Sequence, residues 1–281
     1  MSTSVAEENI IHDLDLSSYF DVNLKNQEVL HVLGVGDCHI GSQFFNKEYF
    51  EYTLNKLKAL QGKSKLIIYL NGDILECASK HVGDAAFKQI LDVDEQIDLA
   101  VEYFEPFKKS IRGITLGNHE YRLVKDYGSN PLKQLAKRLD IAFKPYIYDK
   151  FTINNEHEVR ILAKHGMGKA ARADLAYGKV HRETVGFNQY DICFYGHLHH
   201  LGHDRRFKVD LEGVNNKTLC KPDNVVLVGN FLKYNNSYAH LTGLSPLPEG
   251  YMVCRIDKNK RITFEPRYIY EEKPELMDLE F

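Results

Sequence analysis

The sequence predicts a mixed α/β protein, in which an α/β first half is joined to a β-rich second half. Near-continuous apolar runs at 30–37 and 65–73 are typical of strands that are buried on both faces. Between them, apolar residues recur at helical spacing through 47–60, which completes a strand–helix–strand unit. After residue 146, strand-like segments follow one another with little helical signal.

The other elements follow from the same patterns. A second helix signal covers 94–110 and leads into a short strand at 111–116. Residues 131–139 indicate a third helix, because Asn130 suits its N-cap and Pro131 suits its first position. The second half adds one helical stretch at 168–179. Its predicted strands are 146–153, 158–164, 191–195, 206–211, 224–228, 251–256 and 261–268.

The chain is predicted to form one main domain. Its 281 residues are enough to bury a large core without disulfide bonds, and no linker-like stretch separates the two halves. We expect residues 30–272 to make up this domain. Residues 1–29 are expected to form an N-terminal arm or peripheral element, and residues 273–281 an acidic tail.

Composition and charge exclude several classes of protein. The balance of 36 basic and 39 acidic residues argues against a protein that coats nucleic acid non-specifically. No stretch approaches 18 apolar residues and the N-terminus lacks a hydrophobic signal core, so we expect no membrane span. Five cysteines without a CxxC pair indicate reduced thiols and a cytoplasmic location. The sequence leaves the oligomeric state open.

Five short clusters of metal-ligating residue types stand out, each at the C-terminal end of a strand-like run. They are GDCH at 36–39, NGDILE at 71–76, GNHE at 117–120, HG at 165–166 and GHLHH at 196–200. Functional sites assemble at such strand ends in open α/β sheets. Together the carboxylate, imidazole and amide side chains suit Mn, Fe, Zn or Ni better than a pure calcium site.

In this order the clusters resemble the signature of the calcineurin-like metallophosphoesterase superfamily. The pattern D-x-H, GD-x-x-E, GNHE, H-G and GH-x-H spans residues 37–199, more than half of the chain. The resemblance implies a four-layer α/β/β/α sandwich of two mixed β-sheets flanked by helices. It also implies a dinuclear metal centre at one end of the sandwich.

The resemblance further implies which residues form this centre. The residues that it assigns to a first metal ion are Asp37, His39 and His199. Those that it assigns to a second ion are Asn118, His165 and His197. Asp73 is expected to bridge the two ions, and His119 to act as a proton donor or transition-state stabiliser beside the leaving group. Two cations about 3.5–4 Å apart would clamp the attacking and leaving oxygens of an in-line phosphoryl displacement.

Glu76 is the candidate partner of this catalytic histidine. His119 needs an acidic neighbour to hold it protonated, and Glu76 follows Asp73 by three residues. Many relatives carry Asp at this position, so the longer Glu departs from the family pattern. Cys38 lies between two expected ligands, but its side chain is expected to point away from them into the core.

Three features bear on the substrate. The arginine that the superfamily's protein Ser/Thr phosphatases carry after the second block is missing here. Arg122 suits a phosphate contact near the metals, with a solvent-facing helix residue as the alternative. The segment after His165 is locally basic, which suits a polyanion or, equally, an ordinary solvated helix. Within and beyond this segment, Arg172 and His200 are candidates for substrate contacts.

These observations lead to one main expectation and two alternatives. We expect a phosphoesterase with two divalent metal ions, Mn being the first candidate, that attacks its substrate with a metal-activated hydroxide. Its expected substrates are phosphodiesters of nucleic acids or nucleotides. A phosphomonoesterase acting on phosphoprotein or small phosphorylated metabolites is the alternative. A non-catalytic scaffold is more remote, because every expected ligand and His119 are present.

Overall fold

The computed structural model describes residues 20–79, 88–168, 170, 172–187, 190–210, 219–234 and 246–277, with the backbone alone at 208–210 and 219–221. Residues 1–19 of the expected N-terminal arm and 278–281 of the expected acidic tail lie outside the described residues. Among the described residues, no helix has the length and apolar character needed to cross a membrane.

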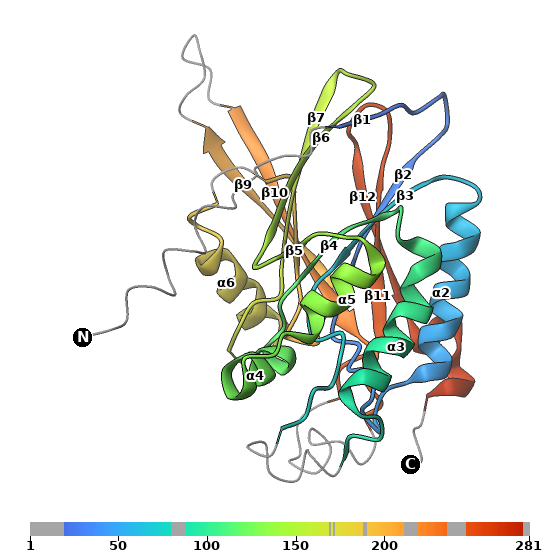
Figure 1. Cartoon of the computed structure of the whole chain (residues 1–281). Coiled ribbons are helices and arrows are strands. Elements are labelled where there is room, and N and C mark those ends of the chain that lie inside the picture. Colours follow the sequence, from blue (N-terminus) through green and yellow to red (C-terminus); the bar gives the residue numbers. More distant parts are fainter. Residues whose placement is uncertain are drawn as a thin grey trace.

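The strands join into one curled mixed sheet (Figure 1). The strands are β1 (Phe20–Val22), β2 (Leu30–Val35), β3 (Lys65–Leu70), β4 (Ile111–Thr115), β5 (Phe143–Lys144), β6 (Ile147–Ile153), β7 (His157–Lys164), β8 (Ile192–Tyr195), β9 (Leu201–Asp210), β10 (Leu219–Asn230), β11 (Gly250–Ile256) and β12 (Ile262–Tyr268). Their order is β1-β6-β7-β8-β10-β11-β2-β3-β4-β5, with β9 beside β10 and β12 beside β11. β2, β3 and β4 run parallel to one another, as do β7, β8 and β10.

The helices lie mostly along the first half of this sheet. They are α2 (Lys47–Gln61), α3 (Val93–Phe104), α4 (Asn118–Tyr127), α5 (Pro131–Leu139), α6 (Ala173–Glu183) and α8 (Ile269–Glu272), with 3-10 turns η2 (Glu105–Phe107) and η3 (Pro274–Leu276). The predicted N-cap of α5 is confirmed, since the Asn130 side chain accepts a hydrogen bond from the Lys133 amide. α3 ends before Pro106, whose ring and missing N–H cannot continue an α-helix.

Two halves of the sheet meet at a short seam. Between β10 and β11 the paired residues are Gly229 with Tyr251 and Asn230 with Gly250. The halves also share a buried core, in which the rings of Tyr69 from β3 and Phe194 from β8 stack 5.9 Å apart. The predicted mixed α/β fold is confirmed. Where the resemblance implies two separate sheets, the strands are hydrogen-bonded into one.

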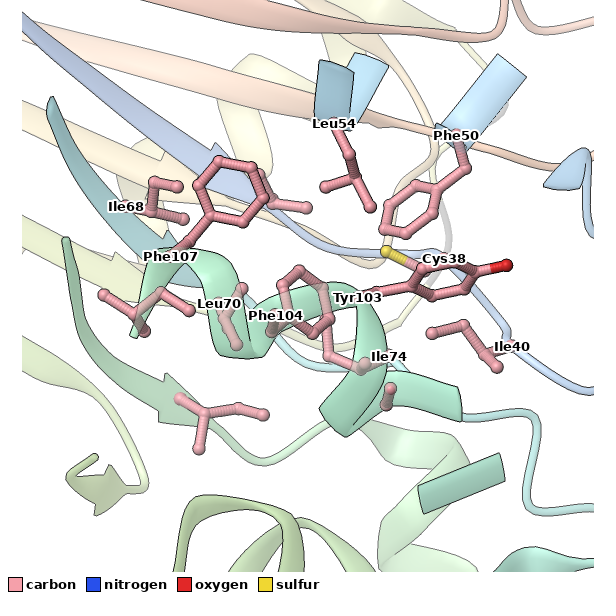
Figure 2. Packing of buried hydrophobic residues seen from close by; sticks show 14 of the residues in the cluster. Cys38, Ile40, Phe50, Leu54, Ile68, Leu70, Ile74, Tyr103, Phe104 and Phe107 are labelled. Carbon is pink, nitrogen blue, oxygen red and sulfur yellow. The ribbon is translucent and has the colours of Figure 1, made fainter. Parts of the chain in front are cut away.

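A second core fills the space between the sheet and helices α2 and α3. Figure 2 shows Phe50 of α2 together with Tyr103 and Phe104 of α3, and these rings pack edge to face. Cys38 lies fully buried in the same cluster, which confirms its expected packing role. On the other half, α6 packs through Ala176 and Val180 onto β8 and β10.

Several elements depart from the sequence-based expectation, among them α4, α6 and β9. α4 was not predicted, because it is a short and mostly polar helix whose buried residues are Glu120 and Leu123. The helix expected at 168–179 is α6, which begins at Ala173. β9 begins at Leu201 rather than at 206, because its first half is polar and pairs with β10 as an outlying strand. Leu211, the expected end of that strand, lies outside the described residues.

Candidate metal centre

The five sequence clusters converge at one edge of the sheet. The clusters follow the C-terminal ends of β2, β3, β4, β7 and β8. Because these strands run parallel within each half, their carboxyl ends meet at the same edge. The first half therefore supplies Asp37, His39, Asp73 and Asn118, and the second half supplies His165, His197 and His199.

One group of ligand atoms is formed by the residues expected at the first metal ion. The side chains of Asp37, His39 and His199 each offer a ligand atom within 4.8 Å of the others. Asp37 Oδ1 lies 3.3 Å from His199 Nε2. His39 Nε2 is buried and has no hydrogen-bond partner. A buried, unpartnered imidazole nitrogen among carboxylates fits a metal ligand, because such nitrogens otherwise find a donor or an acceptor.

A second group brings together Asp73, His165 and His197, again within 4.8 Å. Asp73 Oδ2 lies 3.2 Å from His165 Nε2, and Asn118 Oδ1 lies 3.0 Å from the same nitrogen. His165 Nδ1 donates to the carbonyl oxygen of Asn71 at 2.7 Å, which turns Nε2 toward this group. The Nε2 atom of His197 contacts the carbonyl oxygen of Gly168 at 2.5 Å.

Asp73 connects the two groups. Its Oδ2 atom lies 3.2 Å from His165 Nε2 and 3.9 Å from His39 Nε2. The mixed carboxylate, imidazole and amide donors fit a pair of divalent transition-metal ions. The structure thus gathers all seven residues expected as ligands, while their assignment to particular ions stays a prediction.

The charges of this site act strongly on its histidines. Burial alone would lower the pKa of His165, but the charge and hydrogen bond of Asp73, together with Asp37 and the Asn71 carbonyl, raise the pKa to about 10 in the metal-free chain. Burial likewise opposes protonation of His39, whereas the hydrogen bond and charge of Glu76 help to raise its pKa to about 9. The site therefore attracts positive charge, which is what a cation-binding centre requires.

The backbone is strained at five of the expected ligands. The φ angles lie between 46° and 67°, the left-handed region, at Asp37, His39, Asp73, His197 and His199. Cross-links between the loops hold these conformations. The His197 amide donates to both carboxylate oxygens of Asp37, at 3.0 and 2.8 Å, and the His39 amide donates to the Asp73 carbonyl. Strain that the surroundings hold in place is typical of functional sites.

His119 lies in the first turn of α4, beside this centre. Its Nε2 atom is 4.0 Å from Asp73 Oδ2, and its ring packs edge-on against His39 at 4.3 Å. Burial and the neighbouring His39 lower the pKa of His119 to about 4 in the metal-free chain. A phosphate anion bound beside the ring would favour the protonated form again.

Glu76 contacts both His39 and His119. Its Oε2 atom is 3.1 Å from His39 Nδ1, and its Oε1 atom is 3.7 Å from His119 Nδ1. The main-chain carbonyl of Glu76 accepts a hydrogen bond from His119 Nδ1 at 2.9 Å. The carboxylate is thus closer to His39 than to its expected partner.

The three expected substrate contacts are placed differently. Arg122 lies one turn after His119 on α4, and its Nη1 atom is 3.3 Å from His119 Nδ1. Arg172 is exposed and forms an ion pair with Asp174. His200 is buried, and its Nε2 atom contacts the carbonyl oxygen of Ala170 at 3.1 Å. Of the three, the structure brings Arg122 next to the centre.

Part of the basic segment around and after His165 is paired with acidic residues of the same segment. Lys164 and Lys179 both contact the carboxylate of Glu183, at 3.3 and 2.8 Å. Two of its lysines therefore do not form an unopposed positive surface, which the sequence alone had left open.

Glu120 was missed as a functional candidate. Its side chain is fully buried, with Oε1 accepting from the Leu75 amide at 2.9 Å and Oε2 from the Asp73 amide at 3.2 Å. Burial raises its pKa to about 8. It holds the loop that carries Asp73. In the sequence, Glu120 could have been noticed because it is a charged residue directly after Asn118 and His119 in the GNHE block.

Comparison with known proteins identifies the family of this fold and site. The model described as "Calcineurin-like phosphoesterase" matches residues 30–201. Because this range covers more than half of the chain, the protein belongs to the calcineurin-like phosphoesterase family, a class of phosphoester hydrolases. The resemblance seen in the sequence is confirmed, and a divalent metal centre is expected from the family together with the His and Asp clusters.

Solved structures similar to the chain show low sequence identity. They include a predicted phosphoesterase from Streptococcus pneumoniae, 13% identical, covering 85% of this chain and 98% of that one at a TM-score of 0.36. A metallophosphoesterase from Sphaerobacter thermophilus is 12% identical; the match covers 88% of this chain and 92% of that one, at a TM-score of 0.38. Purple acid phosphatase PPD1 from yellow lupin is 11% identical; the match covers 87% of this chain and 52% of that one, at a TM-score of 0.45. The comparison with curated proteins returned no match.

Proposed function

We propose that the protein is a dinuclear metal-dependent phosphodiesterase acting on nucleotides or nucleic acids. The observation that carries the proposal is the meeting of two ligand groups at the carboxylate of Asp73, 3.2 Å from His165 Nε2 and 3.9 Å from His39 Nε2. When bound, two divalent ions would polarise the phosphoryl group and make a water nucleophilic near neutral pH. Manganese is our first candidate, and iron, zinc and nickel suit the same donors.

The residues around the ions have distinct tasks in this proposal. Asp73 partly neutralises both ions, while the neutral amide of Asn118 adds no negative charge where an anionic substrate must bind. His119 stands beside the leaving group and stabilises or protonates it. The guanidinium of Arg122, next to His119, donates hydrogen bonds to a phosphate oxygen.

The charge near the centre supports a diester over a monoester. A phosphodiester carries one negative charge, whereas a phosphomonoester carries close to two at neutral pH. Arg122 approaches His119, but Lys164 and Lys179 are engaged by Glu183, and Arg172 by Asp174. These pairings also favour a substrate of nucleotide size over a long nucleic acid, which would need an extended positive surface.

A phosphomonoesterase acting on phosphoprotein or small metabolites is the second candidate. The missing arginine after the second block argues against phosphoprotein. Buried free thiols at four described cysteines support a cytoplasmic location for either activity.

One set of assays tests the proposal. The purified protein would be stripped of metal, reloaded with Mn²⁺, and given bis-p-nitrophenyl phosphate, p-nitrophenyl phosphate and labelled single- and double-stranded DNA. We expect the diester to be hydrolysed with the highest kcat/KM and DNA more weakly. A higher kcat/KM on the monoester would establish the alternative activity. Loss of all hydrolysis under Mn, Fe, Zn and Ni alike would leave the scaffold as the remaining function.

A further inference from the structure

We infer that the side chain of Glu76 is a positioning residue for the metal ligand His39, while its main chain positions His119. The inference rests on the metal centre of the proposed function and deepens it. It also separates two roles that the sequence had merged into one catalytic pair of Glu76 and His119.

The geometry of His39 supports the first part. Its Nδ1 atom lies 3.1 Å from Glu76 Oε2, within hydrogen-bond distance. Its Nε2 atom is buried, unpartnered and directed to the Asp73 carboxylate at 3.9 Å. A histidine that binds a metal through one ring nitrogen commonly donates its other N–H to a carboxylate, which fixes the tautomer and the ring orientation. His39 and Glu76 have this arrangement.

Burial makes this contact effective. His39 is 2% exposed and Glu76 is 7% exposed, so water does not compete strongly for either group. His39 also sits at a strained backbone position with φ at 53°. Its ring also packs edge-on against the rings of His119 and His199, and Glu76 supplies the hydrogen bond that selects which ring nitrogen carries the proton.

The geometry of His119 supports the second part. The distance from His119 Nδ1 to Glu76 Oε1 is 3.7 Å, which is too long for a hydrogen bond. The distance from the same nitrogen to the Glu76 carbonyl oxygen is 2.9 Å. Because a carbonyl only accepts, it holds the Nδ1 proton of His119. Substitution of the side chain leaves this carbonyl in place.

The length of the side chain at position 76 matters for the same reason. Glu has one methylene more than Asp, and its Oε2 atom reaches His39 Nδ1. Glu76→Asp would withdraw the carboxylate from His39. Glu76→Gln would keep the length and one acceptor oxygen, and Glu76→Ala would remove the contact. All three variants retain the main-chain carbonyl.

The experiment measures metal binding directly. Titration of Mn²⁺ into the metal-free protein by calorimetry, and Co²⁺ absorption spectra as a second readout, would be applied to the natural chain and to the three variants. Glu102→Ala is the matched control, since Glu102 is exposed on α3. We expect Glu76→Ala and Glu76→Asp to weaken the binding of one ion by about 10- to 100-fold and to alter the Co²⁺ spectrum. Glu76→Gln should have the smallest effect, and the control none.

Each outcome decides between named possibilities. Unchanged affinity and spectrum in a folded Glu76→Asp protein would overturn the inference, and a kcat loss at saturating metal in that same protein would restore the pair with His119. A natural chain that binds neither Mn²⁺ nor Co²⁺ would refute the proposed function itself. Circular dichroism identifies any variant that fails to fold, and if Glu76→Ala does so, the comparison of Glu76→Asp with Glu76→Gln decides.

Discussion

The carboxylate of Glu120 accepts a hydrogen bond from the Leu75 amide at 2.9 Å, and in this way α4 is joined to the loop after β3. The second oxygen of Glu120 accepts from the Asp73 amide at 3.2 Å. The main-chain amide of Asp73 is thus held by Glu120 of α4, the helix that follows the neighbouring strand β4. One buried side chain fixes the backbone that presents the Asp73 carboxylate.

Glu120→Gln is expected to loosen this loop. Gln exchanges one acceptor oxygen for an NH₂ group, which then faces a backbone N–H that it cannot satisfy. Leaving such a buried group unpaired costs about 1–3 kcal/mol, which urea unfolding of the metal-free protein would measure. Glu102→Gln serves as the control, because Glu102 is exposed on α3. Equal unfolding free energies for the two variants would show that the loop does not depend on Glu120.

Asp73→Asn should remove the shared ligand of the two ions. Its neutral amide neutralises neither cation, so we expect fewer than two ions per chain and a strong loss of hydrolysis. Metal content after desalting and kcat/KM with the diester would be measured together. Full metal content with full activity would exclude Asp73 as the bridging residue.

Metal itself should stabilise the folded chain. A ligand that binds only the native state at 100 times its dissociation constant adds about 2.7 kcal/mol to the free energy of unfolding. We therefore expect chelation to lower the Tm and Mn²⁺ to restore it, with a smaller response in Asp73→Asn. Identical melting curves with and without Mn²⁺ in the natural chain would speak against a metal centre.

His119→Ala should affect catalysis without affecting metal content. Loss of a general acid or base lowers the rate by about 10²- to 10⁴-fold. The expected signature is a lower kcat on the diester while both ions remain bound. A rate within twofold of the natural chain would remove His119 from the mechanism.

The two candidate arginines should behave differently. Arg122 lies 3.3 Å from His119, whereas Arg172 is exposed and paired with Asp174. We expect Arg122→Ala to raise KM for the diester, with Arg122→Lys partly restoring it because lysine keeps the charge without the planar fork. Arg172→Ala should leave both kinetic constants close to those of the natural chain. The reverse ranking would move the substrate contact to α6.

Much of the fold was predictable because its central strands are buried on both faces. The apolar runs of β2 and β3 and the helical spacing of α2 were all confirmed. α4 escaped prediction because it is short and mostly polar and starts within the GNHE block. The start of β9 was missed because its first residues are largely polar, although they pair with the apolar end of β10.

The candidate site was predictable in its residues but less so in its contacts. Asp37 and His197 lie 160 positions apart, yet each follows a strand end within a recognisable block. Spacing along the chain could not show that the side chain and main chain of Glu76 approach two different histidines. The partners of Glu120 could not be predicted from the sequence either, because they are main-chain amides, which nearly every residue has.

The short seam between β10 and β11 implies that the metal centre also contributes to holding the two halves of the sheet together. Two residue pairs join the sheet halves there, while the expected ligands come from both sides of the seam. These residues would hold divalent ions from both sides, which would cross-link the two halves at the edge where the candidate site lies. Metal binding would therefore also oppose local opening of the seam. We expect amide hydrogen exchange at the seam to slow when metal is bound.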